Sequence, residues 1–210
     1  DVAAEFINGR PNDNIGITLF AGETFTQCPL TVDHAVLLDM IHNIKCGLIT
    51  DGTAVGMGIA NAVTRLKDSK AKSKVIILLT DGTNNKGDIS PMTAAEIAKS
   101  FGIRVYTIGV GTNGMAPYPY PVGNTVQYVS MPVEIDEKTL TEIAGTTDGN
   151  YFRATSNSKL KEVYEEIDKL EKTKLNVKEY SKRDEEYHWF ALAAFLCVLL
   201  EVLLRNSVLK

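Results

Sequence analysis

The sequence predicts an α/β protein: a three-layer, doubly wound, mostly parallel sheet that is N-terminally truncated, followed by a C-terminal hydrophobic helix. Strand-like and helix-like segments alternate along most of the chain, and this order places helices on both faces of a parallel sheet. Residues 75–79 are consecutive apolar residues, as expected of a central strand buried on both faces. The pattern opens in the middle of a helix at residue 1, which predicts a missing start.

The first half of the chain is expected to form three helices and one strand. Residues 2–7 have helical periodicity, and residues 15–21 are expected to form a strand. Residues 28–30 continue as an extended connection, and Asp33 is the expected N-cap of a helix that reaches Lys45. The next helix opens after Thr53 and contains Gly56 and Gly58, each costing about 1 kcal/mol relative to Ala. Close approach of another backbone explains these glycines better than a phosphate loop, which would need a Lys.

The second half repeats the alternation. Ser90 and Pro91 are expected to start a helix, and residues 103–110 a strand. Residues 111–123, rich in Pro and Tyr, predict an extended polyproline-like loop, either packed on the domain or docking a partner. A short strand at 126–129, a helix capped by Asp136, a strand at 151–154 and a charged helix with one apolar stripe over residues 160–170 complete the domain.

Thr80, Asp81 and Gly82 directly follow the apolar strand. Open α/β sheets bind ligands at the carboxyl ends of their strands. A carboxylate with nearby hydroxyls suits a hard cation such as Mg²⁺, which keeps several of its own waters. The alternative is that Asp81 only caps a turn and that Thr53 only caps a helix.

Composition excludes some classes of function. The formal net charge is -4, with no basic run interleaved with aromatics, which argues against nucleic-acid binding. The three cysteines form neither a CxxC motif nor a zinc spacing, so buried thiols are expected.

The C-terminal segment has a different composition. Residues 190–200 carry no charge, aromatic residues precede them and Arg205 follows. This predicts a transmembrane helix over 188–207, with an amphipathic or partner-packing helix as the alternative. The positive residues favour the C-terminus inside the cell, which places the folded domain on the non-cytoplasmic side.

Four segments in order resemble a von Willebrand factor type A (VWA) domain: residues 20–23, 51–56, 78–82 and 106–111. Residues 25–31 and 113–119, together with the hydrophobic C-terminus, are similar to the BatA membrane proteins of bacterial aerotolerance operons. The resemblance implies a VWA domain at 1–175, a charged linker at 176–187 and the membrane helix at 188–207. It also implies that the first strand and first metal loop of the domain are absent from residues 1–210.

The resemblance further implies a metal-ion-dependent adhesion site. In that family Mg²⁺ is held by an Asp-x-Ser-x-Ser loop, a Thr and an Asp. Thr53 and Asp81 match the second and third loops, whereas no Asp-x-Ser-x-Ser occurs in this sequence. We therefore expect these residues alone to bind Mg²⁺ weakly or not at all.

The function implied is non-catalytic: metal-dependent binding of a protein partner that presents Asp or Glu. The setting implied is a bacterial cytoplasmic membrane complex with sister Bat proteins and a MoxR-type AAA+ ATPase, serving the envelope or stress tolerance. One alternative is a metal-independent structural scaffold. A remote one is a haloacid dehalogenase-like phosphatase, whose nucleophilic Asp would fall at Leu79.

Overall fold

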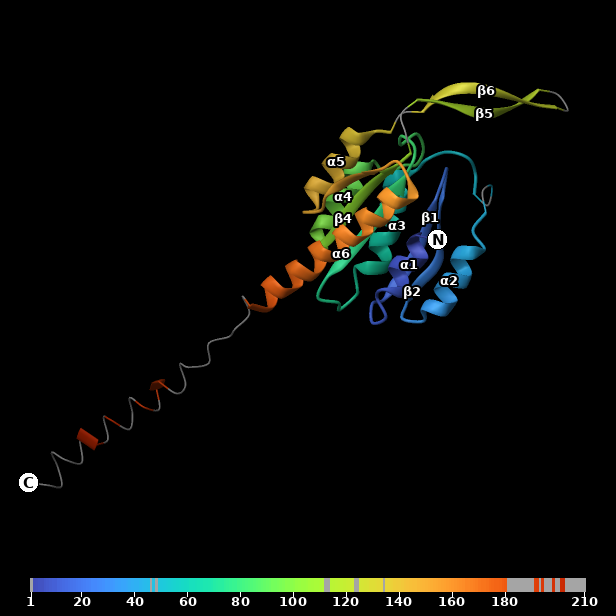
Figure 1. Ribbon diagram of the computed structural model, residues 1–210. Coiled ribbons are helices and arrows are strands. Elements are labelled where there is room, and N and C mark those ends of the chain that lie inside the picture. Colours follow the sequence, from blue (N-terminus) through green and yellow to red (C-terminus); the bar gives the residue numbers. More distant parts are fainter. Residues whose placement is uncertain are drawn as a thin grey trace, which may run out of the picture. The chain divides into compact units, whose positions relative to one another are not determined.

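The computed structural model describes residues 2–45, 47, 49–111, 114–122, 125–133 and 135–180, together with six residues between 191 and 202. The chain divides into two compact units, Asp1–Glu171 and Lys172–Lys210. The elements (Figure 1) are α1 (Val2–Asn8), β1 (Ile15–Phe20), β2 (Thr24–Thr31), α2 (His34–His42), α3 (Val55–Leu66), β3 (Lys74–Thr80), α4 (Pro91–Ser100), β4 (Ile103–Val110), β5 (Gly114–Val122), β6 (Thr125–Val133), α5 (Glu137–Thr146), β7 (Tyr151–Ala154) and α6 (Asn157–Tyr180).

A parallel sheet with the strand order β3-β4-β7 forms the middle of three layers. Ile76 and Leu78 of β3 pack on one face against α3, α4 and α5. The alternate residues of the strand face the other way, toward α6. The predicted α/β architecture with a parallel sheet and helices on both faces is therefore confirmed.

Helix starts follow the caps expected from the sequence. The side chains of Asp33, Ser90 and Asp136 accept hydrogen bonds from backbone N–H groups of the first turns of α2, α4 and α5. Each cap supplies an acceptor to a donor that the helix itself leaves unpaired. A hydrogen bond to Thr139 outweighs burial and holds the pKa of Asp136 below its usual range.

β1 and β2 form a separate antiparallel pair, packed against α1 and α2 around Ile7, Cys28 and Leu37. Residues 28–30, expected to be a connection, belong to β2. Among the described strands β3 pairs only with β4, so it lies at the edge of this sheet and the prediction of a central strand is wrong. The sequence of β3 is nevertheless typical of a buried strand, because helices cover both of its faces.

Residues 114–133 form a two-stranded antiparallel hairpin of β5 and β6. The prediction of a polyproline-like loop over 111–123 is wrong, because most of this segment forms β5. The predicted strand at 126–129 is confirmed and is longer than expected, since it lies within β6. The prolines at 117, 119 and 121 lie opposite Ser130, Tyr128 and Val126. Alternate positions of an antiparallel strand do not donate to the partner strand, so prolines two residues apart are compatible with the pairing.

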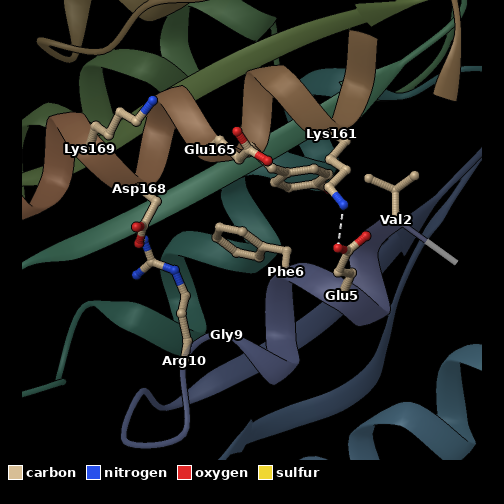
Figure 2. Close-up of a pocket in the computed structure, with 10 residues that line it drawn as sticks. Val2, Glu5, Phe6, Gly9, Arg10, Lys161, Glu165, Asp168 and Lys169 are labelled. Carbon is tan, nitrogen blue, oxygen red and sulfur yellow. Dashed lines mark hydrogen bonds and ion pairs between the residues drawn. The ribbon is translucent and has the colours of Figure 1, made fainter. Parts of the chain in front are cut away.

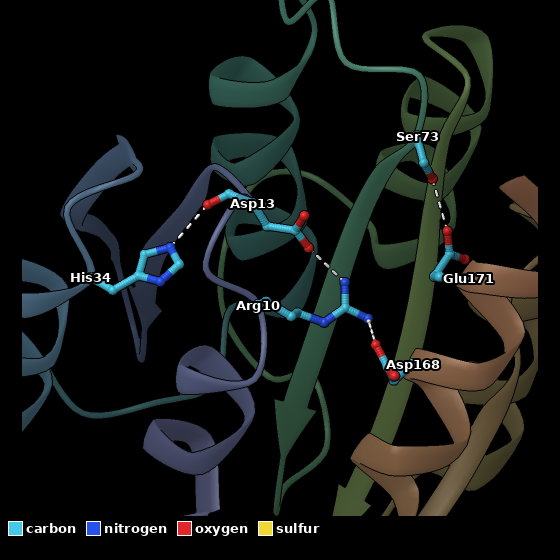
Figure 3. Close-up of polar contacts among 6 residues, drawn as sticks. All are labelled: Arg10, Asp13, His34, Ser73, Asp168 and Glu171. Atoms are coloured by element: carbon cyan, nitrogen blue, oxygen red, sulfur yellow. Dashed lines mark hydrogen bonds and ion pairs between the residues drawn. The ribbon is translucent and has the colours of Figure 1, made fainter.

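A buried charged network lies between β3, β4 and α6 (Figure 3 shows part of it). Glu171 is 4% exposed and accepts hydrogen bonds from Ser73 (2.8 Å), from the Tyr106 hydroxyl (2.6 Å) and from Arg104. Burial alone would raise the pKa of Glu171, but these three donors and the charge of Arg104 outweigh it and lower that pKa. Burial and the neighbouring Glu171 raise the pKa of Tyr106, which keeps its hydroxyl protonated as a donor.

The predicted membrane helix at 188–207 lies mostly outside the described residues. Those of its residues that the structure does describe are helical. Within the described part of the chain, none of the helices combines the length and the apolar character that crossing a bilayer requires.

Candidate functional site at the end of strand β3

Asp81 is presented by a tight turn at the carboxyl end of β3. Thr80 is buried, and its hydroxyl interacts with both the N–H and the C=O of Gly82 at 3.3 Å. This hydroxyl fixes the turn on the inner side, while Asp81 is exposed. The carboxylate therefore faces solvent from a backbone that is locally constrained.

The loop before α3 packs against the same turn. The Thr53 hydroxyl oxygen lies 3.2 Å from the position that a Cβ on Gly82 would occupy. Gly82 has no side chain, and this lets the Thr53 side chain approach the turn beside Asp81. The structure thus brings the two predicted site residues, Thr53 and Asp81, to neighbouring loops at one end of the sheet.

Two asparagines join these loops, and their role was missed by sequence reasoning. The Asn85 side-chain carbonyl accepts from the Thr53 N–H at 2.8 Å, and the Asn85 N–H donates to the Thr53 carbonyl at 3.0 Å. The Asn84 side chain accepts a hydrogen bond, at 2.9 Å, from the N–H of Val55, which is the first residue of α3. The only signal in the sequence was two adjacent amide side chains after a strand, which predicts a turn but not the partner loop.

Thr53 is not the cap of α3. The N-cap residue is Ala54, which provides no side-chain acceptor, and Asn84 takes that role from outside the helix. Thr53 is therefore positioned by its backbone, through both hydrogen bonds to Asn85. The Thr53 hydroxyl does not cap α3.

The end of β1 joins the same assembly. The Gly22 N–H donates to the Thr50 carbonyl and the Ala54 N–H to the Ala21 carbonyl, both at 2.7 Å. Three segments, after β1, before α3 and after β3, therefore meet at one rim. A Cβ on Gly22 would lie 2.7 Å from the Asp51 carbonyl oxygen, so the approach of these backbones requires glycine at this position.

Packing at the start of α3 requires a glycine at position 56. A Cβ there would lie 2.1 Å from the carbonyl oxygen of Ile89, in the segment that leads into α4. The expectation of a close backbone approach is confirmed. The alternative of a phosphate loop has no support from this glycine, because protein backbone already fills the space beside it.

The donor atoms at this rim suit a hard cation in kind. Thr53 offers a hydroxyl oxygen and Asp81 a carboxylate oxygen, and Mg²⁺ takes about six oxygen ligands, several of them waters. Among the described residues there is no group of three or more His, Cys, Asp or Glu side chains placed to hold a metal. Thr53 and Asp81 would therefore fill only part of a coordination shell.

A separate cavity of about 380 Å³ lies between α1 and α6 and includes neither Thr53 nor Asp81 (Figure 2). Its walls carry the Phe6 and Tyr164 rings, with centroids 4.6 Å apart, and an ion pair between Lys161 and Glu5. Arg10 lies over the Phe6 ring at 4.7 Å and pairs with Asp168 at 2.6 Å. The charged groups named here pair with one another, so we interpret this cavity as a gap between two packed helices.

Residues 1–166, which include this rim, match the sequence profile of the von Willebrand factor type A domain. The chain belongs to this family. The VWA fold accounts for the parallel sheet and for the clustering of loops at the carboxyl ends of its strands, and VWA domains are generally interaction modules rather than enzymes.

Two solved structures and one curated relative are similar to this VWA chain. BatB from Bacteroides thetaiotaomicron is 32% identical with a TM-score of 0.69, covering 81% of this chain and 85% of that one. An aerotolerance-related membrane protein from Bacteroides fragilis is 28% identical, also with a TM-score of 0.69, covering 80% and 83%. An uncharacterized protein from Borreliella burgdorferi is 26% identical over 98% of this chain and 60% of its own length. The chain thus spans about 60% of that relative.

Proposed function

We propose that this VWA domain mediates metal-dependent protein–protein interaction at the rim formed by Thr53 and Asp81. The observation that carries the proposal is the packing of Thr53 against Gly82, directly beside the exposed carboxylate of Asp81. The two loops that carry these oxygen donors are joined by hydrogen bonds of the Thr53 backbone to the Asn85 side chain and backbone.

Each residue has a distinct role in this proposal. Thr53 and Asp81 offer oxygen ligands, directly or through water, while Asn84 and Asn85 hold the two loops together. A bound Mg²⁺ would supply an open coordination position to an Asp or Glu of the partner. The remaining ligands would come from water and from groups outside these two loops.

The surroundings of the domain are proposed on the similarity to Bat-type proteins. We place the domain in a bacterial cytoplasmic membrane complex, anchored through 188–207 and facing the non-cytoplasmic side. Sister Bat proteins and a MoxR-type AAA+ ATPase are the expected partners, in support of the envelope or of stress tolerance. The similarity to BatB and to an aerotolerance-related membrane protein supports this setting.

The phosphatase alternative has no nucleophile at the required position. Leu79 stands where that mechanism needs an Asp, and its side chain packs with the apolar cluster on the α6 side of the sheet. Without a carboxylate there, no aspartyl-phosphate can form.

The decisive variant is Asp81→Ala in the full-length protein. We expect it to abolish Mg²⁺-dependent capture of the partner in a pull-down and the heat of Mg²⁺ titration, with an unchanged circular dichroism spectrum. The matched control is Asp68→Ala, an exposed carboxylate beyond the opposite end of α3, which should behave as wild type. Equal partner capture in EDTA, or Mg²⁺-independent stability of the wild type, would instead favour the scaffold.

A further inference from the structure

The β5–β6 hairpin has two edges of opposite character. Its register pairs Val122 with Thr125 across two intervening residues, which makes this closing pair a hydrogen-bonded one. Alternation along the ladder then makes the pairs of Pro117, Pro119 and Pro121 non-hydrogen-bonded. At such pairs the backbone N and C=O point outward, away from the partner strand.

The outer edge of β5 therefore cannot accept another strand well. Three of its outward nitrogens belong to Pro117, Pro119 and Pro121, which have no hydrogen to donate. Proline at an edge strand prevents edge-to-edge pairing.

The outer edge of β6 has the opposite property. The same alternation turns the N–H and C=O groups of Val126, Tyr128 and Ser130 outward. Among the described strands β6 pairs only with β5, so this edge has no strand partner in the structure. Pro132 is the next outward residue and limits the usable edge to these three positions.

We propose that this edge of β6 pairs with the same edge of a second copy of the chain. The two hairpins then form one four-stranded antiparallel sheet, related by a twofold axis at Tyr128. In this register Tyr128 lies opposite Tyr128 of the second copy, and Val126 lies opposite Ser130. Every outward N–H of these three residues obtains a carbonyl acceptor.

The absence of charged side chains from this hairpin and the exposed apolar surface of β6 favour a second copy over an unrelated strand. Residues 111–133 contain no Asp, Glu, Lys, Arg or His, so two copies meet without like-charge repulsion, and no charge selects an oppositely charged partner. Tyr128 is 73% exposed and Val129 47% exposed, leaving apolar surface for cross-strand contacts. A lone two-stranded hairpin is marginal in water, and additional strands stabilise it.

The assembly is also self-limiting. Both outer edges of the four-stranded sheet would be β5 edges with their prolines, so no third copy can add. The expected product is a closed dimer rather than a filament.

The first test uses the 210-residue chain in a nonionic detergent, with mass measured by light scattering after size exclusion. We expect the wild type to be a dimer at tens of micromolar. Tyr128→Pro should halve the mass, because it removes the central outward donor without touching the β5–β6 ladder. Tyr128→Ala keeps the N–H and should remain dimeric, with a dissociation constant that is at most severalfold larger than that of the wild type. A monomeric wild type, or a Tyr128→Pro variant as dimeric as the wild type, would overturn the proposal.

The second test measures register by disulfide trapping. Paired Tyr128→Cys residues would have Cα atoms about 5.5 Å apart, within disulfide range. Ser130→Cys residues would lie about 14 Å apart, four residues out of register, so they should not cross-link. Mild oxidation should therefore trap a covalent dimer for Tyr128→Cys above the level of the wild type with its three native cysteines. Equal trapping of both variants, or of neither, would reject this pairing. Loss of Mg²⁺ binding at Asp81 would leave both tests unaffected.

Discussion

Glu171 shows how one buried carboxylate can carry much of the local stability at the residue scale. It accepts from Ser73, which directly precedes β3, and from Arg104 and Tyr106 of β4, and so links α6 to both strands. Removing one partner of a buried ion pair leaves the other charge uncompensated and costs about 3–5 kcal/mol. The side chain of Arg104 is only 15% exposed, so water cannot replace Glu171 fully.

We therefore expect Glu171→Gln to lower the free energy of unfolding by about 3–5 kcal/mol in urea denaturation. The control is Glu137→Gln, which breaks a surface pair with Arg153 and should cost less than about 1 kcal/mol. Equal effects of the two substitutions would contradict the role of burial.

The same site predicts a pH dependence. The folded-state pKa of Glu171 lies below its ordinary value of 4.5, so its contribution is present above that value. The contribution is lost as the pH falls through the lowered, folded-state pKa. The stability difference between wild type and Glu171→Gln should therefore be constant near neutral pH and shrink below about pH 4.5. A difference that grew on acidification would refute this assignment.

At the scale of elements, α3 depends on a cap that comes from another loop. Its N-cap residue Ala54 has no side-chain acceptor, and Asn84, just after β3, supplies one to Val55. The start of α3 and the turn that bears Asp81 are consequently one structural unit. Changes in one loop should be felt in the other.

Asn84→Ala should destabilise the protein by about 1 kcal/mol, the usual cost of losing a helix cap. Asn84→Asp keeps an acceptor and adds a negative charge at a helix N-terminus, so it should retain or exceed wild-type stability. Urea midpoints of the three proteins give this order directly. If Ala and Asp at position 84 were equally destabilising, the cap would not be the reason.

At the scale of the whole domain, β1–β2 and β3-β4-β7 are joined by helices, not by strand pairing among the described residues. α3 packs with Phe20 of β1 and with Ile76 and Leu78 of β3. On the other side α1 meets α6 through the Phe6 and Tyr164 rings and through the Arg10–Asp168 ion pair. Helix contacts therefore connect the two sheets, together with the hydrogen bonds between the loops at the rim.

Phe6→Ala should lower the free energy of unfolding by about 1.5–3 kcal/mol. Its effect on local opening should differ between the two sheets. Hydrogen exchange should accelerate at amides of β1 and β2, whose docking through α1 is weakened, and change little in β4. The control, Phe25→Ala, removes a ring that is 54% exposed and should stay within about 0.5 kcal/mol of wild type. Uniform acceleration across both sheets would mean that they open as one unit.

Local rules of the sequence predicted much of the domain. The caps at Asp33, Ser90 and Asp136, the apolar strand at 75–79 and the stripe on α6 were all readable, because each depends on neighbours within a turn or on residue periodicity. The hairpin of β5 and β6 was not readable as such. Its prolines disfavour a strand locally, and only the register with β6 places them where no hydrogen bond is needed.

The sequence alone therefore determined the class of fold, the alternation of its elements and the chemical types of its candidate ligands, since these follow from short-range preferences and from periodic burial. The tertiary structure alone decided that Thr53 packs beside the turn of Asp81, that Asn84 and Asn85 join their loops, and that β3 lies at an edge among the described strands. The physical reason is that contacts between residues some thirty positions apart depend on how whole elements dock, and docking is set by the packing of side chains from every layer at once.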